Sequence, residues 1–199
     1  MRNQTSTHFS IDWAKERLDE MDVTVTSLEG KLGSVQADAR DKAGKLLAQL
    51  RNSRDGFWDL VKGQAEAGEA GWSSAKTKLD SQWATFESQV ETYVESVGSQ
   101  VEIQQETFQL QAAAQLKAWR EAADKLGSAA NDFAAERRGE IDATVKRMAD
   151  AAVVAEETLQ KLSQAGTQSW SVLRAALAET RGTFDRANQA VRDEFKRAV

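Results

Sequence analysis

The chain has 199 residues, a net charge of −5, no proline and no cysteine. The lack of cysteine excludes a disulfide framework and a thiolate metal site, and the lack of proline removes the commonest helix breaker. The composition, with 29% charged residues and much alanine, is typical of long helices. It offers no basic stripe to neutralise phosphates, which argues against nucleic-acid binding.

Residues 1–9 are polar and contain no apolar stretch of the kind found in secretory signals. We therefore expect a short polar tail, followed by a single elongated helical domain over 10–199, in a cytoplasmic protein. His8, the only histidine, lies in this tail. A general base or a metal ligand needs partners held at fixed geometry, and the tail supplies none.

From Leu18 onwards apolar residues recur every three or four positions, and no useful segment shows the period of two that strands require. This spacing predicts long amphipathic helices and an all-α fold. We expect turns where polar residues meet glycine or asparagine, at 30–34, 52–56, 127–132 and 163–169. Gly98 and Ser99 leave the apolar spacing intact, so we expect them inside a helix, with a cost of about 1 kcal/mol for the glycine.

Between residues 68 and 134 the apolar spacing repeats every 11 residues, so that Leu79, Val90 and Val101 share one position. Such a repeat averages about 3.67 residues per turn, which favours a slight or right-handed supercoil over a left-handed leucine zipper. An unbroken helix of this length would span about 300 Å. We therefore expect the helices to fold back as an elongated antiparallel hairpin, a bundle or a coiled coil.

A weak internal repeat relates the two halves of the chain. An offset of 98 residues aligns Trp72 with Trp170, Leu79 with Leu177, and Phe86 with Phe184. The segment at 31–34 recurs at 125–128, but at a different offset. A duplication of 10–98 and 99–199 therefore stays open beside the single domain.

Residues 79–116 contain six acidic side chains and no lysine or arginine. Pairs such as Glu87 and Glu91 share a helix face, as di-metal carboxylate sites require, but those sites also use histidines that face inward. We interpret the pairs as a solvated acidic face. The sequence has neither a phosphate-binding glycine loop nor a nucleophile motif. We therefore expect no catalytic residues, metal ligands, cofactor or small-molecule substrate.

Four of the six tryptophans fall on the apolar stripe. They indicate either aromatic packing against alanine on an antiparallel neighbour or an aromatic face that docks on lipid or another hydrophobic surface. We expect the interaction stripe to comprise Trp72, Leu79, Trp83, Phe86, Val90, Trp119, Trp170, Leu173, Leu177 and Phe184.

The series Trp72, Ala75, Leu79, Trp83 and Phe86 has a counterpart in Trp170, Leu173, Leu177, Arg181 and Phe184. This pattern resembles the helical units of bacterial apolipoprotein-like and phasin-like proteins, and of stress-associated coiled-coil proteins. The resemblance covers roughly residues 35–98 and 140–199 and rests on periodicity and tryptophan placement. It implies coating of lipid or storage-granule surfaces, or self-association, without catalysis.

A narrow apolar stripe is buried best against another stripe, because an amphipathic helix gains most of its stability from packing. We therefore predict a non-catalytic structural or interaction protein that forms homo-oligomers through its long helices. The alternative is an apolipoprotein- or phasin-like coat on a lipid or storage-granule surface. A chain that stays disordered until dried or crowded is a third interpretation, which the aromatic content disfavours.

Overall fold

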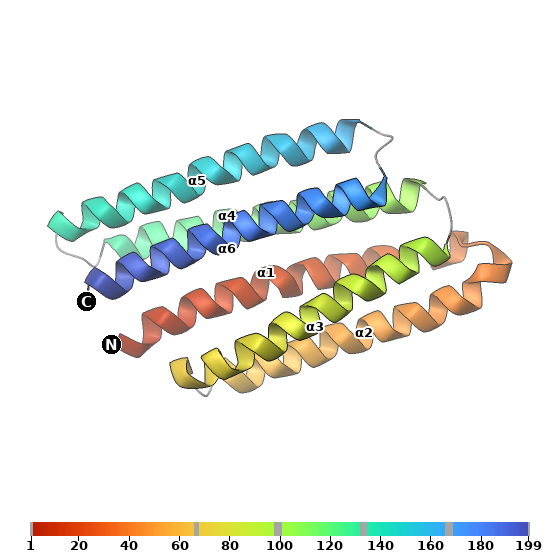
Figure 1. Cartoon of the computed structure of the whole chain (residues 1–199), viewed down its shortest axis with the longest axis horizontal. Coiled ribbons are helices and arrows are strands. Elements are labelled where there is room, and N and C mark those ends of the chain that lie inside the picture. The colour runs from red at the N-terminus through yellow and green to blue at the C-terminus, as the bar shows by residue number, and fades with distance from the viewer. Residues whose placement is uncertain (1, 66–67, 98–100, 132–134, 166–168, 199) are drawn as a thin grey trace. The chain divides into compact units, whose positions relative to one another are not determined.

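The computed structural model describes residues 2–65, 68–97, 101–131, 135–165 and 169–198, and in these ranges the chain is helical without a strand. A short 3-10 helix, η1 (Leu32–Ser34), follows the first α-helix. The α-helices (Figure 1) are α1 (Arg2–Lys31), α2 (Ala37–Ala65), α3 (Gly68–Ser96), α4 (Val101–Ala130), α5 (Ala135–Gln164) and α6 (Trp170–Ala198). The predicted all-α class is confirmed.

The helices are almost equal in length, with 29 or 30 residues each. Each is therefore about 44 Å long. No proline interrupts them, and helix α1 also includes residues 2–9, which the sequence analysis assigns to a polar tail. None of the helices within the described ranges has the length and apolarity needed to cross a lipid bilayer.

Side chains close the turn after α1. Ser34 Oγ donates to the carbonyl oxygen of Lys31 at 2.7 Å. Arg40 Nη2 donates to the carbonyl oxygens of Gly33 and Val35 at 3.1 and 3.0 Å. These bonds satisfy carbonyl groups near the end of the helix, where no intrahelical partner is available. The predicted turns at 30–34, 127–132 and 163–169 include the last residues of α1, α4 and α5, while residues 132 and 166–168 of these turns lie outside the described residues.

The predicted turn at 52–56 is wrong, because these residues lie inside α2. The helix continues because its polar and small residues here lie next to α3. Ser53 donates a hydrogen bond to Gln89 Oε1 of α3 at 2.8 Å, and a Cβ placed on Gly56 would lie 3.6 Å from Gln82 Nε2. Contacts with the neighbouring helix therefore override the local preference of these residues for a turn.

Two helix ends were not predicted from the apolar spacing. Helix α2 ends at Ala65 and α3 begins at Gly68, although the spacing runs on across this point. Gly98 and Ser99, expected inside a helix, lie outside the described residues, between the end of α3 at Ser96 and the start of α4 at Val101.

The helices gather into two compact units. The α2–α3 unit comprises residues 17–111, and the α5–α6 unit comprises residues 1–16 and 112–199. The apolar spacing predicted one domain over 10–199, and the weak internal repeat left open a division near residue 98. The units divide the chain differently, because α1 and α4 each contribute residues to both.

In the α2–α3 unit, α2 and α3 pack side by side and run in opposite directions (Figure 1). Helix α1 contacts all the other helices of this unit. It pairs with α2 through Asp22 and Arg54, with α3 through Arg17 and Trp83, and with α4 through Thr24 and Gln111. Helix α1 is thus the central helix of the α2–α3 unit.

The α5–α6 unit is built in the same way, with α5 and α6 side by side in opposite directions. Here α4 contacts all the other helices. It pairs with α1 through Glu121 and Lys15, with α5 through Arg120 and Glu156, and with α6 through Trp119 and Phe184. Helix α4 is thus the central helix of the α5–α6 unit.

Candidate interaction site

All ten residues of the predicted interaction stripe are buried, and the most exposed of them, Trp170, retains 8% of its accessible surface. In the α2–α3 unit, α3 carries Trp72, Leu79, Trp83, Phe86 and Val90. In the α5–α6 unit, α4 carries Trp119 and α6 carries Trp170, Leu173, Leu177 and Phe184. The structure thus brings these residues together as two separate groups, each packed within its unit. That these residues bind a second molecule stays a prediction.

The α3 part of the stripe is aromatic along its length. The ring centroids of Trp83 and Phe86 lie 5.8 Å apart at 31°, and the Arg17 guanidinium carbon lies 5.8 Å from the Trp83 ring. A cation over a tryptophan face adds about 0.5–2 kcal/mol to the packing. Further along α3, Tyr93 is fully buried, and this burial raises the pKa of its hydroxyl above 10.0.

The α6 part of the stripe packs against the central helix α4. Trp119 and Phe184 meet edge to face, with ring centroids 5.4 Å apart at 74°. Such aromatic pairs contribute about 0.5–1.5 kcal/mol beyond the area they bury. The same core also contains Leu126, Ile141, Met148 and Val191, so three helices share it.

Polar side chains are also buried where α1 meets α4 in the α2–α3 unit. Gln111 Nε2 donates to Thr24 Oγ1 at 2.8 Å. Thr107 is fully buried, and its hydroxyl has no hydrogen-bond partner within the described part of the chain. A buried hydroxyl without a partner costs about 1–3 kcal/mol. We call Thr24, Thr107 and Gln111 the polar seam; the apolar spacing that guided the sequence analysis carries no signal for it.

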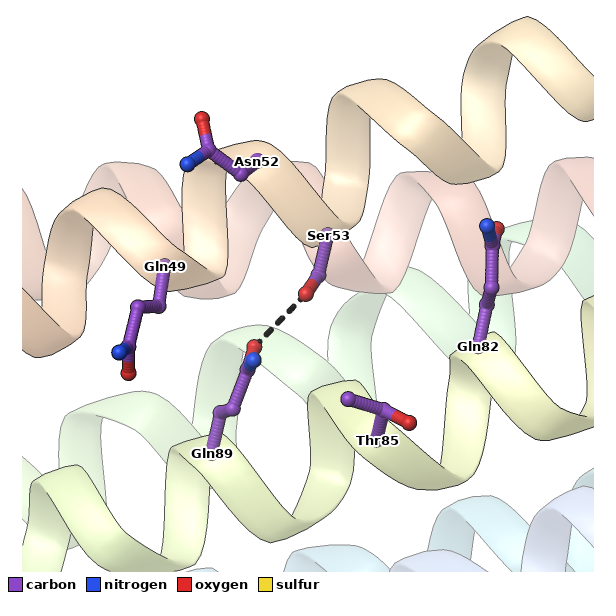
Figure 2. Close-up of a pocket in the computed structure, with 6 residues that line it drawn as sticks. All are labelled: Gln49, Asn52, Ser53, Gln82, Thr85 and Gln89. Atoms are coloured by element: carbon purple, nitrogen blue, oxygen red, sulfur yellow. Dashed lines mark hydrogen bonds between the residues drawn. The ribbon is translucent and has the colours of Figure 1, made fainter.

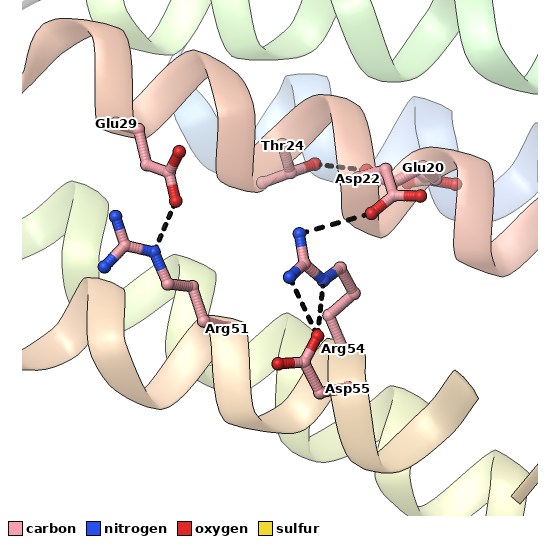
Figure 3. A network of polar contacts seen from close by, with 7 residues as sticks. All are labelled: Glu20, Asp22, Thr24, Glu29, Arg51, Arg54 and Asp55. Atoms are coloured by element: carbon pink, nitrogen blue, oxygen red, sulfur yellow. Dashed lines mark hydrogen bonds and ion pairs between the residues drawn. The ribbon is translucent and has the colours of Figure 1, made fainter. Parts of the chain in front are cut away.

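Figure 3 shows the ion pairs that join α1 to α2. Across the two helices, Arg51 Nε pairs with Glu29 and Arg54 pairs with Asp22 at 3.4 Å. Arg54 also pairs with its neighbour on α2, Asp55, at 2.8 Å. Burial raises the pKa of Asp22 in spite of the opposing charge of Arg54. Each of these side chains keeps part of its surface in water, so the pairs fix how α1 lies on α2 more than they stabilise it.

Each unit is completed by a helix segment from the other half of the chain. Residues 1–16 of α1 belong to the α5–α6 unit, where Lys15 pairs with Glu121 at 3.0 Å. The hydrogen bond from Lys15 lowers the pKa of Glu121. Residues 101–111 belong to the α2–α3 unit, where Glu106 pairs with Lys31 at 2.7 Å. We call 1–16 and 101–111 the completing segments; the sequence analysis did not foresee them.

A third feature that was not predicted from the sequence is a shallow groove between α2 and α3, shown in Figure 2. It is lined by Gln49, Asn52 and Ser53 from α2 and by Gln82, Thr85 and Gln89 from α3. None of these side chains carries a charge. The polar residues at 52–56 predicted a turn here instead of one wall of a groove.

Few large apolar side chains are exposed within the described residues: Trp58, Leu110, the adjacent pair Val153 and Val154, and Val172. They lie on α2, α4, α5 and α6, and scattered apolar residues of this kind are normal on a protein surface. The apolar surface that could hold a partner is therefore concentrated in the buried stripe. No protein-family model matches this chain, and neither a curated protein nor a solved structure matches it.

Proposed function

We propose that this chain is a non-catalytic structural protein of the cytoplasm that self-associates by exchanging helix segments between copies. The supporting observation is that each unit is completed by a segment from the other half of the chain. A second copy carries the same segments and can supply them with the same contacts, which is a low-cost route to dimers. The long helices, with their 11-residue spacing, act as antiparallel hairpins in this assembly. Nucleic acid and small-molecule substrates have no part in it.

Exchange leaves the contacts of each unit unchanged, because Lys15 pairs with Glu121 whether both belong to one copy or to two. The free-energy difference between the closed monomer and the exchanged dimer then consists mainly of the lost freedom of two molecules. Protein concentration therefore decides which form is populated. The fraction of exchanged dimer therefore rises with the concentration of the chain.

A crosslink within one copy tests the exchange directly. The chain has no cysteine, so introduced cysteines can be linked selectively. Lys15→Cys with Glu121→Cys, joined by a short bismaleimide, ties the completing segment 1–16 to its own copy. As a matched control, Glu29→Cys with Arg51→Cys ties α1 to α2 inside the α2–α3 unit. This crosslink leaves the segment 1–16 free to exchange, because that segment belongs to the α5–α6 unit. The molecular mass is measured by sedimentation velocity across about a hundredfold dilution.

The unmodified chain and the crosslinked control are expected to gain mass with concentration. The chain crosslinked between positions 15 and 121 is expected to stay monomeric, and the same variant without crosslinker is expected to associate. A monomeric unmodified chain at every concentration would show that the proposed function is wrong. Association of the chain locked at 15 and 121 to the same extent as the control would show that exchange of the segment 1–16 does not hold the copies together.

The polar seam favours a second candidate function, the coat on a lipid or storage-granule surface. If the α2–α3 unit opened, an apolar surface could cover the stripe of α3. The same opening would return the buried Thr107 hydroxyl to water. Since the stripe tryptophans are already buried, their emission would shift little on binding. Vesicles of neutral phosphatidylcholine with brominated chains provide a direct reading, because bromine quenches tryptophan on contact. Unquenched emission at saturating lipid would exclude the coat function on this surface.

A further inference from the structure

The groove between α2 and α3 is an uncharged surface in a chain with 29% charged residues. Four amide side chains and two hydroxyl side chains line it, and it holds about 350 Å³. In Figure 2, Gln49 and Ser53 of α2 point toward α3, and three side chains of α3 point toward α2: Gln82, Thr85 and Gln89. The volume lies within the range of about 300–1,000 Å³ that ligand pockets occupy.

The groove offers hydrogen-bonding atoms that the protein itself leaves open. The Thr85 hydroxyl donates to the carbonyl oxygen of Ser81 at 2.9 Å, so its oxygen can still accept a hydrogen bond. The amide groups of Gln49 and Asn52 are exposed, and each can donate and accept.

The hydroxyl row continues along α3 beyond the groove. Ser81, Ser88 and Thr92 are exposed, and Thr92 repeats the bond of Thr85 by donating to the carbonyl oxygen of Ser88 at 2.9 Å. From Ser81 to Thr92 the helix rises about 16 Å. The surface therefore suits a chain-like ligand better than a single small ring.

The acidic side chains near the groove disfavour some classes of ligand. Residues 79–96 of α3, which include its wall of the groove, carry four acidic and no basic side chains. On the α2 side, Arg51 and Arg54 are paired with carboxylates of α1 and α2. The acidic charge of α3 repels phosphate, sulfate and carboxylate ligands, and it repels a second copy that presents the same face. Sugar hydroxyl groups carry no charge and, like the amides of the groove, both donate and accept. We propose that the α2–α3 groove binds a neutral glycan chain through its amide and hydroxyl side chains.

Affinity electrophoresis of the full chain in native gels tests this proposal, with dextran, amylopectin or galactomannan in the gel and dextran sulfate as the anionic comparison. The groove variant combines Gln49→Ala and Thr85→Ala. The matched control combines Thr158→Ala and Gln160→Ala on the exposed surface of α5, where the Thr158 hydroxyl also donates to a backbone carbonyl, that of Val154, at 2.9 Å. Circular dichroism checks that both variants keep the helicity of the unmodified chain.

At least one neutral polymer is expected to retard the unmodified chain and the control equally, and dextran sulfate is expected to leave both unretarded. The groove variant is expected to bind roughly tenfold more weakly, as the loss of two hydrogen-bonding side chains implies. Unchanged mobility of the unmodified chain in all three neutral polymers would overturn the proposal. Equal retardation of the groove variant and the control would do the same. Neither result depends on whether the copies exchange segments.

Discussion

Tyr93 places a buried polar group in the core of the α2–α3 unit. It is the single tyrosine of the chain, it is fully buried on α3, and its hydroxyl has no hydrogen-bond partner within the described residues. Removing a buried hydroxyl without a partner relieves a desolvation cost and leaves the ring in place. Tyr93→Phe is therefore expected to raise the free energy of unfolding by about 1 kcal/mol at neutral pH, as measured by urea denaturation.

The same residue predicts a dependence on alkaline pH. Burial raises the pKa of Tyr93 in the folded chain above 10.0, so the unfolded chain loses this proton at a lower pH than the folded chain does. Stability is thus unaffected well below pH 10 and falls as the pH rises through the folded pKa. Absorbance at 295 nm should place the ionisation midpoint above that of a free tyrosine, and Tyr93→Phe should remove this part of the alkaline loss. A midpoint at the ordinary value would contradict the burial.

Trp83 and Trp58 form a matched pair of tryptophans in the α2–α3 unit. Trp83 is 7% exposed and contacts Phe86 and Arg17, whereas Trp58 is 46% exposed and lies near Lys62. Trp83→Ala is expected to lower the free energy of unfolding by about 3–5 kcal/mol. Trp58→Ala is expected to change it by less than about 0.5 kcal/mol. Urea denaturation of both variants would disprove the stripe packing if the two costs were equal.

At the scale of whole helices, two glycines weaken the elements that contain them. Gly44 lies in α2 and Gly139 in α5, and a Cβ at either position would meet nothing within 4 Å. Alanine reduces the freedom of the unfolded chain and has a higher helix propensity. Gly44→Ala and Gly139→Ala should each raise the free energy of unfolding by about 0.5–1 kcal/mol, measured as a shift of the urea midpoint at constant slope. No gain at either site would indicate that its helix is not formed in solution.

The apolar spacing predicted the helices and the burial of the stripe well, because every residue of the stripe must face another helix. It failed at the turns for the same reason. When α2 gives way to α3, the stripe stays on the inner face of both helices, so the spacing continues where the helix ends. The groove and the polar seam could not be predicted, since Ser53 and Gln111 find their hydrogen-bond partners, Gln89 and Thr24, far away in the sequence.

At the scale of the whole molecule, the completing segments connect the stability of one unit to that of the other. Helix α1 supplies 1–16 to the α5–α6 unit and 17–31 to the α2–α3 unit, and α4 is divided in the same manner. Helix formation is cooperative along its length. If α1 loses its packing in one unit, the rest of the helix loses support in the other. The two units are therefore expected to unfold together.

Leucine-to-alanine changes at corresponding positions can test this coupling. Leu79 on α3 and Leu177 on α6 are both almost completely buried, so each change should cost about 2–5 kcal/mol. Amide hydrogen exchange, followed by mass spectrometry of peptides, should show that either change lowers protection in both units alike. Leu110→Ala, at an exposed leucine of α4, serves as the control and should leave protection unchanged. If Leu177→Ala lowered protection in α5 and α6 alone, the shared helices would not couple the units. Exchange of segments between copies would then require only one unit to open.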